Sequence, residues 1–96
     1  MYMKIHITEE HTILAACDED LAGRTFREDN KRLDVSELFY RGESVERDAL
    51  VRKMKGATIM NLVGEGPVSI AIEEGYASED NVIEIDGVRH VQVVLI

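Results

Sequence analysis

The C-terminal part of the chain marks the boundaries of its elements more clearly than any other part. An apolar run at 58–63 is followed by a glycine bend at 64–66 and by Pro67, a residue favoured at the start of helices. Gly75 ends the apolar helix that this proline opens, and Asp86–Gly87 is typical of a two-residue hairpin turn. The segment therefore predicts a strand, a helix and a hairpin in that order.

The C-terminal hairpin can also be given a register. Its turn sets three pairs of residues opposite each other, Ile85 with Val88, Glu84 with Arg89 and Ile83 with His90. Almost every residue of the run at 91–96 is apolar, so a strand formed there is apolar on both faces. We therefore expect it inside the sheet, or at an edge that a partner subunit covers.

The N-terminus predicts another hairpin. Residues 2–8 alternate apolar and polar side chains with the period of a half-buried strand, and 12–17 form a second apolar run. A three-residue turn at 9–11 sets two pairs opposite each other, Ile5 with Ala15 and Ile7 with Ile13. The two strands then share one apolar face.

Two principal helices are predicted in the rest of the chain. Ser44 is a typical N-cap for a helix over 45–55, and a second helix covers 67–74. The run at 58–63 reads as a strand, with a continuation of the first helix as the alternative. Together these elements predict a single α+β domain over residues 1–96, with a mixed or antiparallel sheet and a C-terminal β-hairpin. The predicted core comprises Ile5, Ile7, Ile13, Phe26, Leu33, Leu50, Met54, Ile59, Val68, Ile72, Ile83, Ile85 and Val93.

Composition narrows the class of protein. The 96 residues are 45% hydrophobic and 31% charged, and no apolar run approaches the roughly 18 residues of a membrane span. The N-terminus has no signal-peptide pattern, and the lone Cys17 fits a reducing interior, so we expect a cytoplasmic protein without membrane contact. The net charge of −8 opposes binding of nucleic acid over the whole surface, so such a role needs a local basic face.

Several sequence blocks carry a resemblance. The stretch CDEDLAGRTFRE at 17–28, and ATIMNLVGE followed by AIEEG, NVIEI and GVRHVQVV, resemble DUF424, a small uncharacterised archaeal family. The resemblance extends over nearly the whole chain, although Arg89 and Val91 stand where members tend to have proline and alanine. It implies a cytosolic protein without an established activity, with at most a loose association with RNA or the translation machinery.

The glycine bend is one candidate site, for a small anionic ligand. An N-terminal helix turn can present free amides, such as those of Val68 and Ser69, to a phosphate or carboxylate. The bend lacks the lysine and hydroxyl pair of a P-loop, and a purely structural turn is the alternative. The candidate ligand-binding residues are Gly64, Gly66, Val68, Ser69, His90 and Gln92.

No residue pattern predicts catalysis or a bound metal or cofactor. Cys17 is followed by three acidic residues, an environment that disfavours a reactive thiolate, so we expect a buried structural thiol. His6, His11 and His90 lack the spacing of metal ligands. For His90, a histidine satisfied by the backbone is the alternative to a ligand-binding role.

A basic hairpin is the second candidate site, for RNA. Residues 24–28 and 31–35 pair around an Asp29–Asn30 turn, with Phe26 against Leu33 inside and Arg27 against Arg32 outside. Like charges directly opposite each other are unfavourable, which indicates an anionic partner. Neutralisation by nearby acidic residues is the alternative. The candidate RNA-binding residues are Arg24, Arg27, Lys31 and Arg32.

Three functions are consistent with these patterns. The first is a noncatalytic cytosolic binding module for RNA or a ribonucleoprotein, which uses the basic hairpin. The second is a small anionic-ligand-binding protein that uses the Gly64–Ser69 loop. The third is a homo-oligomeric or protein-interaction adaptor whose apolar C-terminal strand pairs with a partner.

Overall fold

The computed structural model describes residues 1–95, which form a six-stranded mixed sheet, a separate two-stranded sheet and three α-helices. The strands are β1 (Tyr2–Ile7), β2 (Thr12–Cys17), β3 (Thr25–Glu28), β4 (Lys31–Asp34), β5 (Glu43–Ser44), β6 (Ile59–Val63), β7 (Ile83–Ile85) and β8 (Val88–Val94). The helices are α1 (Glu37–Tyr40), α2 (Arg47–Met54) and α3 (Glu65–Glu73), with 3₁₀ turns η1 (Glu19–Leu21) and η2 (Glu79–Asn81). This arrangement confirms the predicted α+β class, the two principal helices and the C-terminal hairpin.

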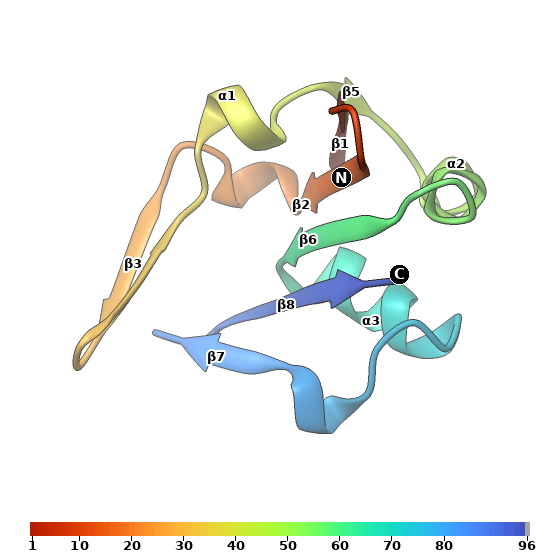
Figure 1. Cartoon of the computed structure of the whole chain (residues 1–96). Helices are drawn as coiled ribbons and strands as arrows, with labels where there is room; N and C mark the ends of the chain where they lie inside the picture. Colours follow the sequence, from red (N-terminus) through yellow and green to blue (C-terminus); the bar gives the residue numbers. More distant parts are fainter. Residues whose placement is uncertain (96) are drawn as a thin grey trace.

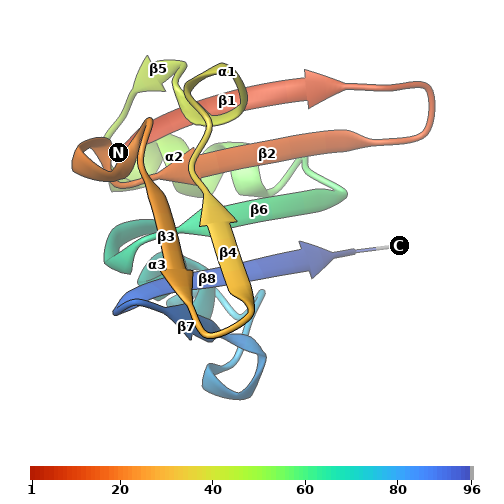
Figure 2. The ribbon, with the colours of Figure 1, turned by 90° about the vertical axis from the view of Figure 1, so that its left-hand side faces the viewer.

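The large sheet has the order β5-β1-β2-β6-β8-β7 (Figure 1). Strands β2 and β6 are parallel, and the other neighbouring pairs are antiparallel. The run at 58–63 is thus a strand at the centre of the sheet, and residues 91–94 of the apolar C-terminal run lie inside the sheet as part of β8, while the prediction for residue 96 lies outside the described residues. Helices α2 and α3 cover one face, whereas α1 and the β3–β4 hairpin lie over the other (Figures 1 and 2).

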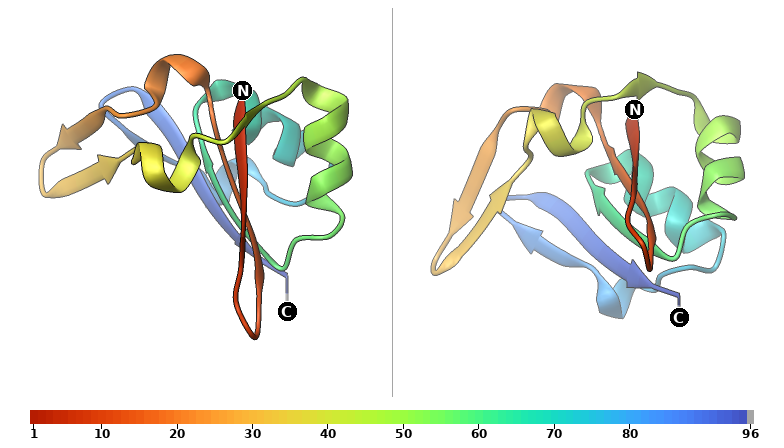
Figure 3. Two further views of the ribbon diagram at one scale, coloured as in Figure 1. Left: turned by 90° about the horizontal axis from the view of Figure 1, so that it is seen from above. Right: turned by 45° about the horizontal axis from the view of Figure 1, so that its top comes forward.

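Each face has its own core, because alternate side chains of a strand point to opposite faces. The core on the helix side includes Leu14, Ala16, Leu50, Met54, Met60, Leu62, Val68, Ala71, Val91 and Val93. The core on the hairpin side includes Ala15, Cys17, Phe26, Leu33, Val35, Tyr40, Val63 and Ile85. Strands β2 and β6 are therefore apolar on both faces, as central strands between two layers usually are. Figure 3 shows the sheet between these two layers.

The predicted register of the N-terminal hairpin is wrong by one residue. The amide of Thr8 donates to the carbonyl of His11 at 2.9 Å, which closes the turn over two residues instead of three. The pairs are consequently Ile5 with Leu14 and Ile7 with Thr12. A slip of one residue changes which side chains share a face. Ile7 is 79% exposed, so its assignment to the core is also wrong.

The starts of both principal helices also differ from the prediction. Ser44 is not an N-cap, because it belongs to β5, pairs with Tyr2 and donates its hydroxyl to Glu19. Helix α2 begins at Arg47 instead. Helix α3 begins at Glu65, two residues before Pro67, because a carboxylate from another segment binds its first turn, as described below.

Both two-residue hairpins have their predicted registers. Phe26 faces Leu33 in the β3–β4 hairpin, and Ile85 faces Val88 in the β7–β8 hairpin. Ile83 is nevertheless 45% exposed, so its place in the predicted core is wrong. It begins the short edge strand β7, and the β3–β4 hairpin covers Ile85 at the other end of that strand.

Candidate functional site

The glycine bend lies where the two parallel strands end side by side. Asp18 follows β2 and Gly64 follows β6, and the amide of Asp18 donates to the carbonyl of Val63 at 3.2 Å. Gly64 has a φ of 99°, which lets the chain turn from the strand directly into α3. Ligands often bind beyond the carboxyl ends of parallel strands. A shallow hollow of about 200 Å³ lies here, lined by Asp18, Asp20, Leu21, Gly64, Glu65, Gly87, Val88 and Arg89.

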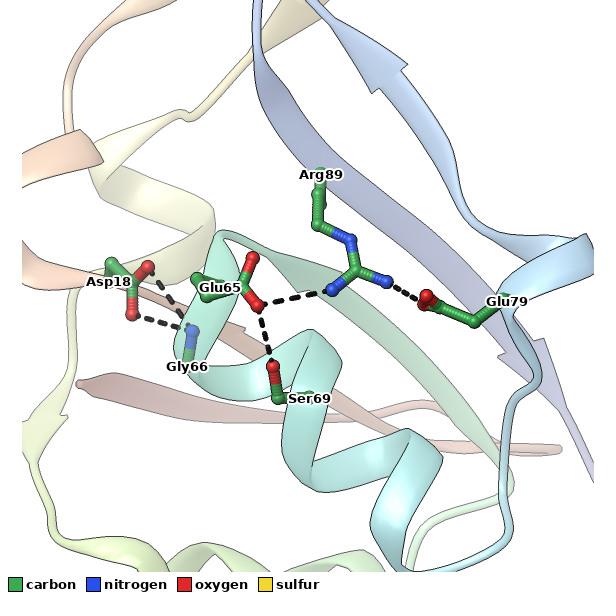
Figure 4. Close-up of polar contacts among 6 residues, drawn as sticks. All are labelled: Asp18, Glu65, Gly66, Ser69, Glu79 and Arg89. Atoms are coloured by element: carbon green, nitrogen blue, oxygen red, sulfur yellow. Dashed lines mark hydrogen bonds and ion pairs between the residues drawn. The ribbon is translucent and has the colours of Figure 1, made fainter.

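The N-terminus of α3 is already occupied by a carboxylate from the protein itself. The Gly66 amide lies 3.2 Å from Oδ1 and 3.3 Å from Oδ2 of Asp18 (Figure 4). Partial burial raises the pKa of Asp18 above its ordinary value, and the hydrogen bond from Gly66 opposes that rise. Asp18 thus occupies the position where an anionic ligand would meet the helix dipole.

Other groups of the bend are engaged within the protein as well. The amide of Val68 donates to the carbonyl of Gly64 at 3.2 Å, so the prediction of a free amide there is wrong. The Ser69 hydroxyl donates to Glu65, which also accepts from Arg89 at 3.2 Å (Figure 4). The positive φ at this bend belongs to Gly64, whereas Gly66 lies within α3.

Arg89 connects the bend to the C-terminal hairpin. Its side chain is largely covered, and its second guanidinium nitrogen pairs with Glu79 beyond α3 (Figure 4). The hollow therefore combines three carboxylates, from Asp18, Asp20 and Glu65, with one arginine that is already paired. This balance of charge does not favour a phosphate or a carboxylate as ligand.

The last two predicted ligand residues lie on β8, and the structure brings only one of them near the bend. His90 pairs with Val63, next to Gly64, and its Nδ1 donates to the carbonyl of Leu62 at 2.9 Å. Gln92 pairs with Asn61 further along the strand. The alternative prediction, a histidine satisfied by the backbone, is therefore confirmed for His90.

The four basic residues of the second candidate site all lie exposed on the β3–β4 hairpin, with Arg27 directly opposite Arg32. Arg32 pairs with Asp34 at 3.0 Å, and Arg24 lies 4.9 Å from the centre of the Phe26 ring. Hydrogen bonds from Thr25 and Arg32 lower the pKa of Asp34. Within residues 1–95, Arg24, Arg27 and Lys31 form no ion pair. Direct ion pairing with an acidic residue therefore involves one of the four, Arg32, although the charge of Asp34 also interacts with Arg27.

The tip of this hairpin is attached to the large sheet. Glu28 is one of the acidic residues near the arginines in the sequence, but its carboxylate accepts a hydrogen bond from the backbone amide of Asp86 at 2.6 Å. This contact joins the β3–β4 hairpin to the β7–β8 turn. Phe26 and Leu33 point toward the large sheet. The outer face of the hairpin, with Arg27 and Arg32, is therefore turned away from that sheet.

Sequence reasoning missed the roles of Asp18 and Arg89. An aspartate directly after an apolar strand was a usable signal for Asp18, but its partner Gly66 is 48 residues away in the chain.

Cys17 is fully buried as predicted, and burial together with the neighbouring Asp18 raises its pKa to about 11. Within residues 1–95 no group of histidine, cysteine and acidic side chains is arranged to hold a metal ion. None of the helices in that range has the length and apolar character needed to cross a membrane.

Comparison with known proteins places this chain in a family. A model of the family described as a protein of unknown function, DUF424, matches residues 5–96, and the chain belongs to this family. Its structure is similar to the crystal structure of an uncharacterized conserved protein from Methanopyrus kandleri, with a TM-score of 0.85 and 35% sequence identity. The similarity covers 99% of this chain and 90% of that one. No match is found among curated proteins.

Proposed function

We propose that this protein is a noncatalytic cytoplasmic binding module that contacts single-stranded RNA, alone or in a ribonucleoprotein, through the outer face of its β3–β4 hairpin. The observation that carries the proposal is the pair of arginines, Arg27 and Arg32, directly opposite each other on that exposed face. Like charges in such a position destabilise a hairpin by a fraction of a kcal/mol, and an anionic ligand removes this cost.

The surroundings of the pair support an anionic polymer more than a small anion. Arg24, just before β3, and Lys31, just after the turn, form no ion pair within residues 1–95, so further cations lie at the base and the tip of the hairpin, beside the arginine pair rather than on its outer face. Phe26 and Leu33 are the buried residues of the two strands, and a hollow of about 240 Å³, lined by Gly23, Arg24, Thr25, Asp34, Val35 and Ser36, lies at the base of the hairpin. A phosphate chain can contact cations that are spread along the length of the hairpin, whereas a small anion contacts only one or two of them.

The net charge of −8 constrains how such binding works. The rest of the surface repels a polyanion, so contact has to be confined to the hairpin and its salt dependence has to be small. A few phosphate contacts supply affinity without base readout. We therefore expect the contact with RNA to be weak and local. Any preference for an RNA sequence then comes from a partner protein or from the structure of the RNA.

The test compares two double charge reversals that change the net charge equally. Arg27→Glu with Arg32→Glu alters the hairpin, and Arg52→Glu with Lys53→Glu alters two exposed residues of α2 that form no ion pair in the described chain. We expect the hairpin variant to bind a fluorescent mixed-sequence single-stranded RNA roughly tenfold more weakly, with a salt slope lower by about one unit for each phosphate that it no longer neutralises. The α2 variant should bind as the unmodified protein does. Equally weakened binding in both variants, or unchanged binding in a hairpin variant with an unchanged melting temperature, would contradict the proposal.

A further inference from the structure

The outer edge of β8 is only partly covered by its neighbour in the sheet. Strand β8 runs from Val88 to Val94, but β7 pairs only with its first part, as far as the pair of Ile83 with His90. On the inner side, the amide of Leu95 donates to Thr58, and the carbonyl of Arg89 accepts from Gly64. Odd-numbered residues of β8 thus direct their backbone groups toward β6.

Because backbone groups alternate in an antiparallel strand, the even-numbered residues point the other way. The N–H and C=O groups of Gln92 and Val94 therefore face outward beyond the end of β7, and both residues are exposed. Within residues 1–95 no hydrogen bond reaches these four groups. Their spacing is that of one edge of a β-ladder.

This edge also lacks the usual protection against strand pairing. Natural edge strands commonly carry a proline, a bulge or a charged side chain, and the sequence VQVV at 91–94 contains none of these. A hollow of about 220 Å³ accompanies the edge, lined by β8 together with Tyr76, Ala77 and Asn81. Val94, 54% exposed, and Ile83 add apolar surface on the open face.

Charge indicates what kind of strand fits here. From Gly56 to Leu95 the chain has one basic residue, Arg89, which Glu65 and Glu79 already engage. The acidic residues of the same segment are Glu65, Glu73, Glu74, Glu79, Asp80, Glu84 and Asp86; Arg47 pairs with Glu73 and Glu74, whereas Asp80, Glu84 and Asp86 form no ion pair in the described chain. A second copy of this chain would bring an equally acidic edge, whereas a basic segment is attracted.

We propose that the free edge of β8, at Gln92 to Val94, accepts an extended basic segment of a partner protein as an additional strand. The backbone of that segment pairs with the outward groups of Gln92 and Val94. Its apolar side chains cover Val94 and Ile83, and its cations face the acidic surround. This site lies on a different sheet from the arginine pair of the hairpin, so it does not depend on RNA binding.

The test uses a short synthetic peptide that alternates lysine with valine, and a matched peptide that alternates glutamate with valine. We expect the lysine peptide to bind, to shift the amide signals of Gln92 and Val94 in ¹⁵N spectra and to slow the hydrogen exchange of those two amides. Val94→Lys should weaken binding about tenfold or more, because it places a cation on the edge. Ile7→Lys, which makes the same kind of change at an exposed apolar residue of β1, should leave binding unchanged.

Three results would overturn the proposal. Equal binding of the glutamate peptide would remove the charge argument, and binding of the lysine peptide without changes at Gln92 and Val94 would place it elsewhere on the acidic surface. A concentration-dependent doubling of mass that Val94→Lys abolishes, without peptide binding, would assign the edge to a second copy of the chain.

Discussion

The two faces of the six-stranded sheet are covered in different ways. On one face, α2 and α3 form a continuous layer over fully buried side chains such as Leu14 and Leu62. On the other, a hairpin with two buried residues and one short helix leave Ile13 and Ile59 partly exposed. The difference indicates that the helix side supplies most of the stability, whereas the hairpin side and the neighbouring strand edge leave exposed the groups on which the two proposals rest.

The largest effect should come from shortening a side chain in the helix-side core. Leu62→Ala removes a fully buried side chain from the centre of the sheet, and we expect a loss of about 3 to 4 kcal/mol in the free energy of unfolding. Leu33→Ala makes the same change under the hairpin, where the layer can collapse, and should cost about 2 kcal/mol. Urea unfolding with unchanged m-values measures both, and equal losses would mean that the two layers are equally rigid.

A smaller effect is expected where the two layers meet, at Asp18. Asp18→Ala leaves the partly buried amide of Gly66 without a partner and should cost about 1 to 2 kcal/mol, whereas Asp18→Asn keeps an acceptor and should cost less. Urea unfolding of the two variants at neutral pH separates these values. A loss as large for asparagine as for alanine would show that the negative charge, and not the acceptor, stabilises the first turn of α3.

The same residue predicts a pH dependence with a definite sign. The folded pKa of Asp18 is raised above 3.8, so the folded protein holds this proton more tightly than the unfolded chain does. Its contribution to stability is therefore greatest below the unfolded pKa and is lost as pH rises through the folded pKa. Relative to Asp18→Asn, the unmodified protein should therefore have a higher free energy of unfolding at acid pH than at neutral pH. The opposite slope would indicate that the hydrogen bond from Gly66 outweighs burial.

Local signals explain which parts of this fold could be predicted. The turns at Asp86–Gly87 and Asp29–Asn30 gave correct registers, because a two-residue connection fixes the pairing on both sides, and Asp86 and Gly87 indeed both have positive φ. The predicted register of the N-terminal hairpin was wrong because the hydrogen bonds of Thr8 shorten its turn by one residue.

The candidate sites were less predictable, because their decisive contacts join distant parts of the chain. The basic residues of the hairpin could be found from the sequence, and so could the glycine bend. The carboxylate that occupies the bend comes from Asp18, and Glu28 binds a turn 58 residues further on. Neither pairing leaves a periodic pattern in the sequence. The separation of β3–β4 from the large sheet likewise follows from tertiary packing rather than from strand propensity.

The smallest effect should come from the contact that holds the hairpin tip to the sheet. Glu28→Ala removes the acceptor for the exposed amide of Asp86, and we expect a cost below about 1 kcal/mol, since water can replace the carboxylate. Hydrogen exchange at Phe26 and Leu33 should nevertheless become faster, because the tip is then free to open. Glu84→Ala removes the same charge from an exposed residue that forms no ion pair in the described chain, and it should change neither quantity. If exchange at the hairpin does not change in Glu28→Ala, then Phe26 and Leu33 alone hold the hairpin on the sheet, and the difference between the two faces lies in their area of contact rather than in their mobility.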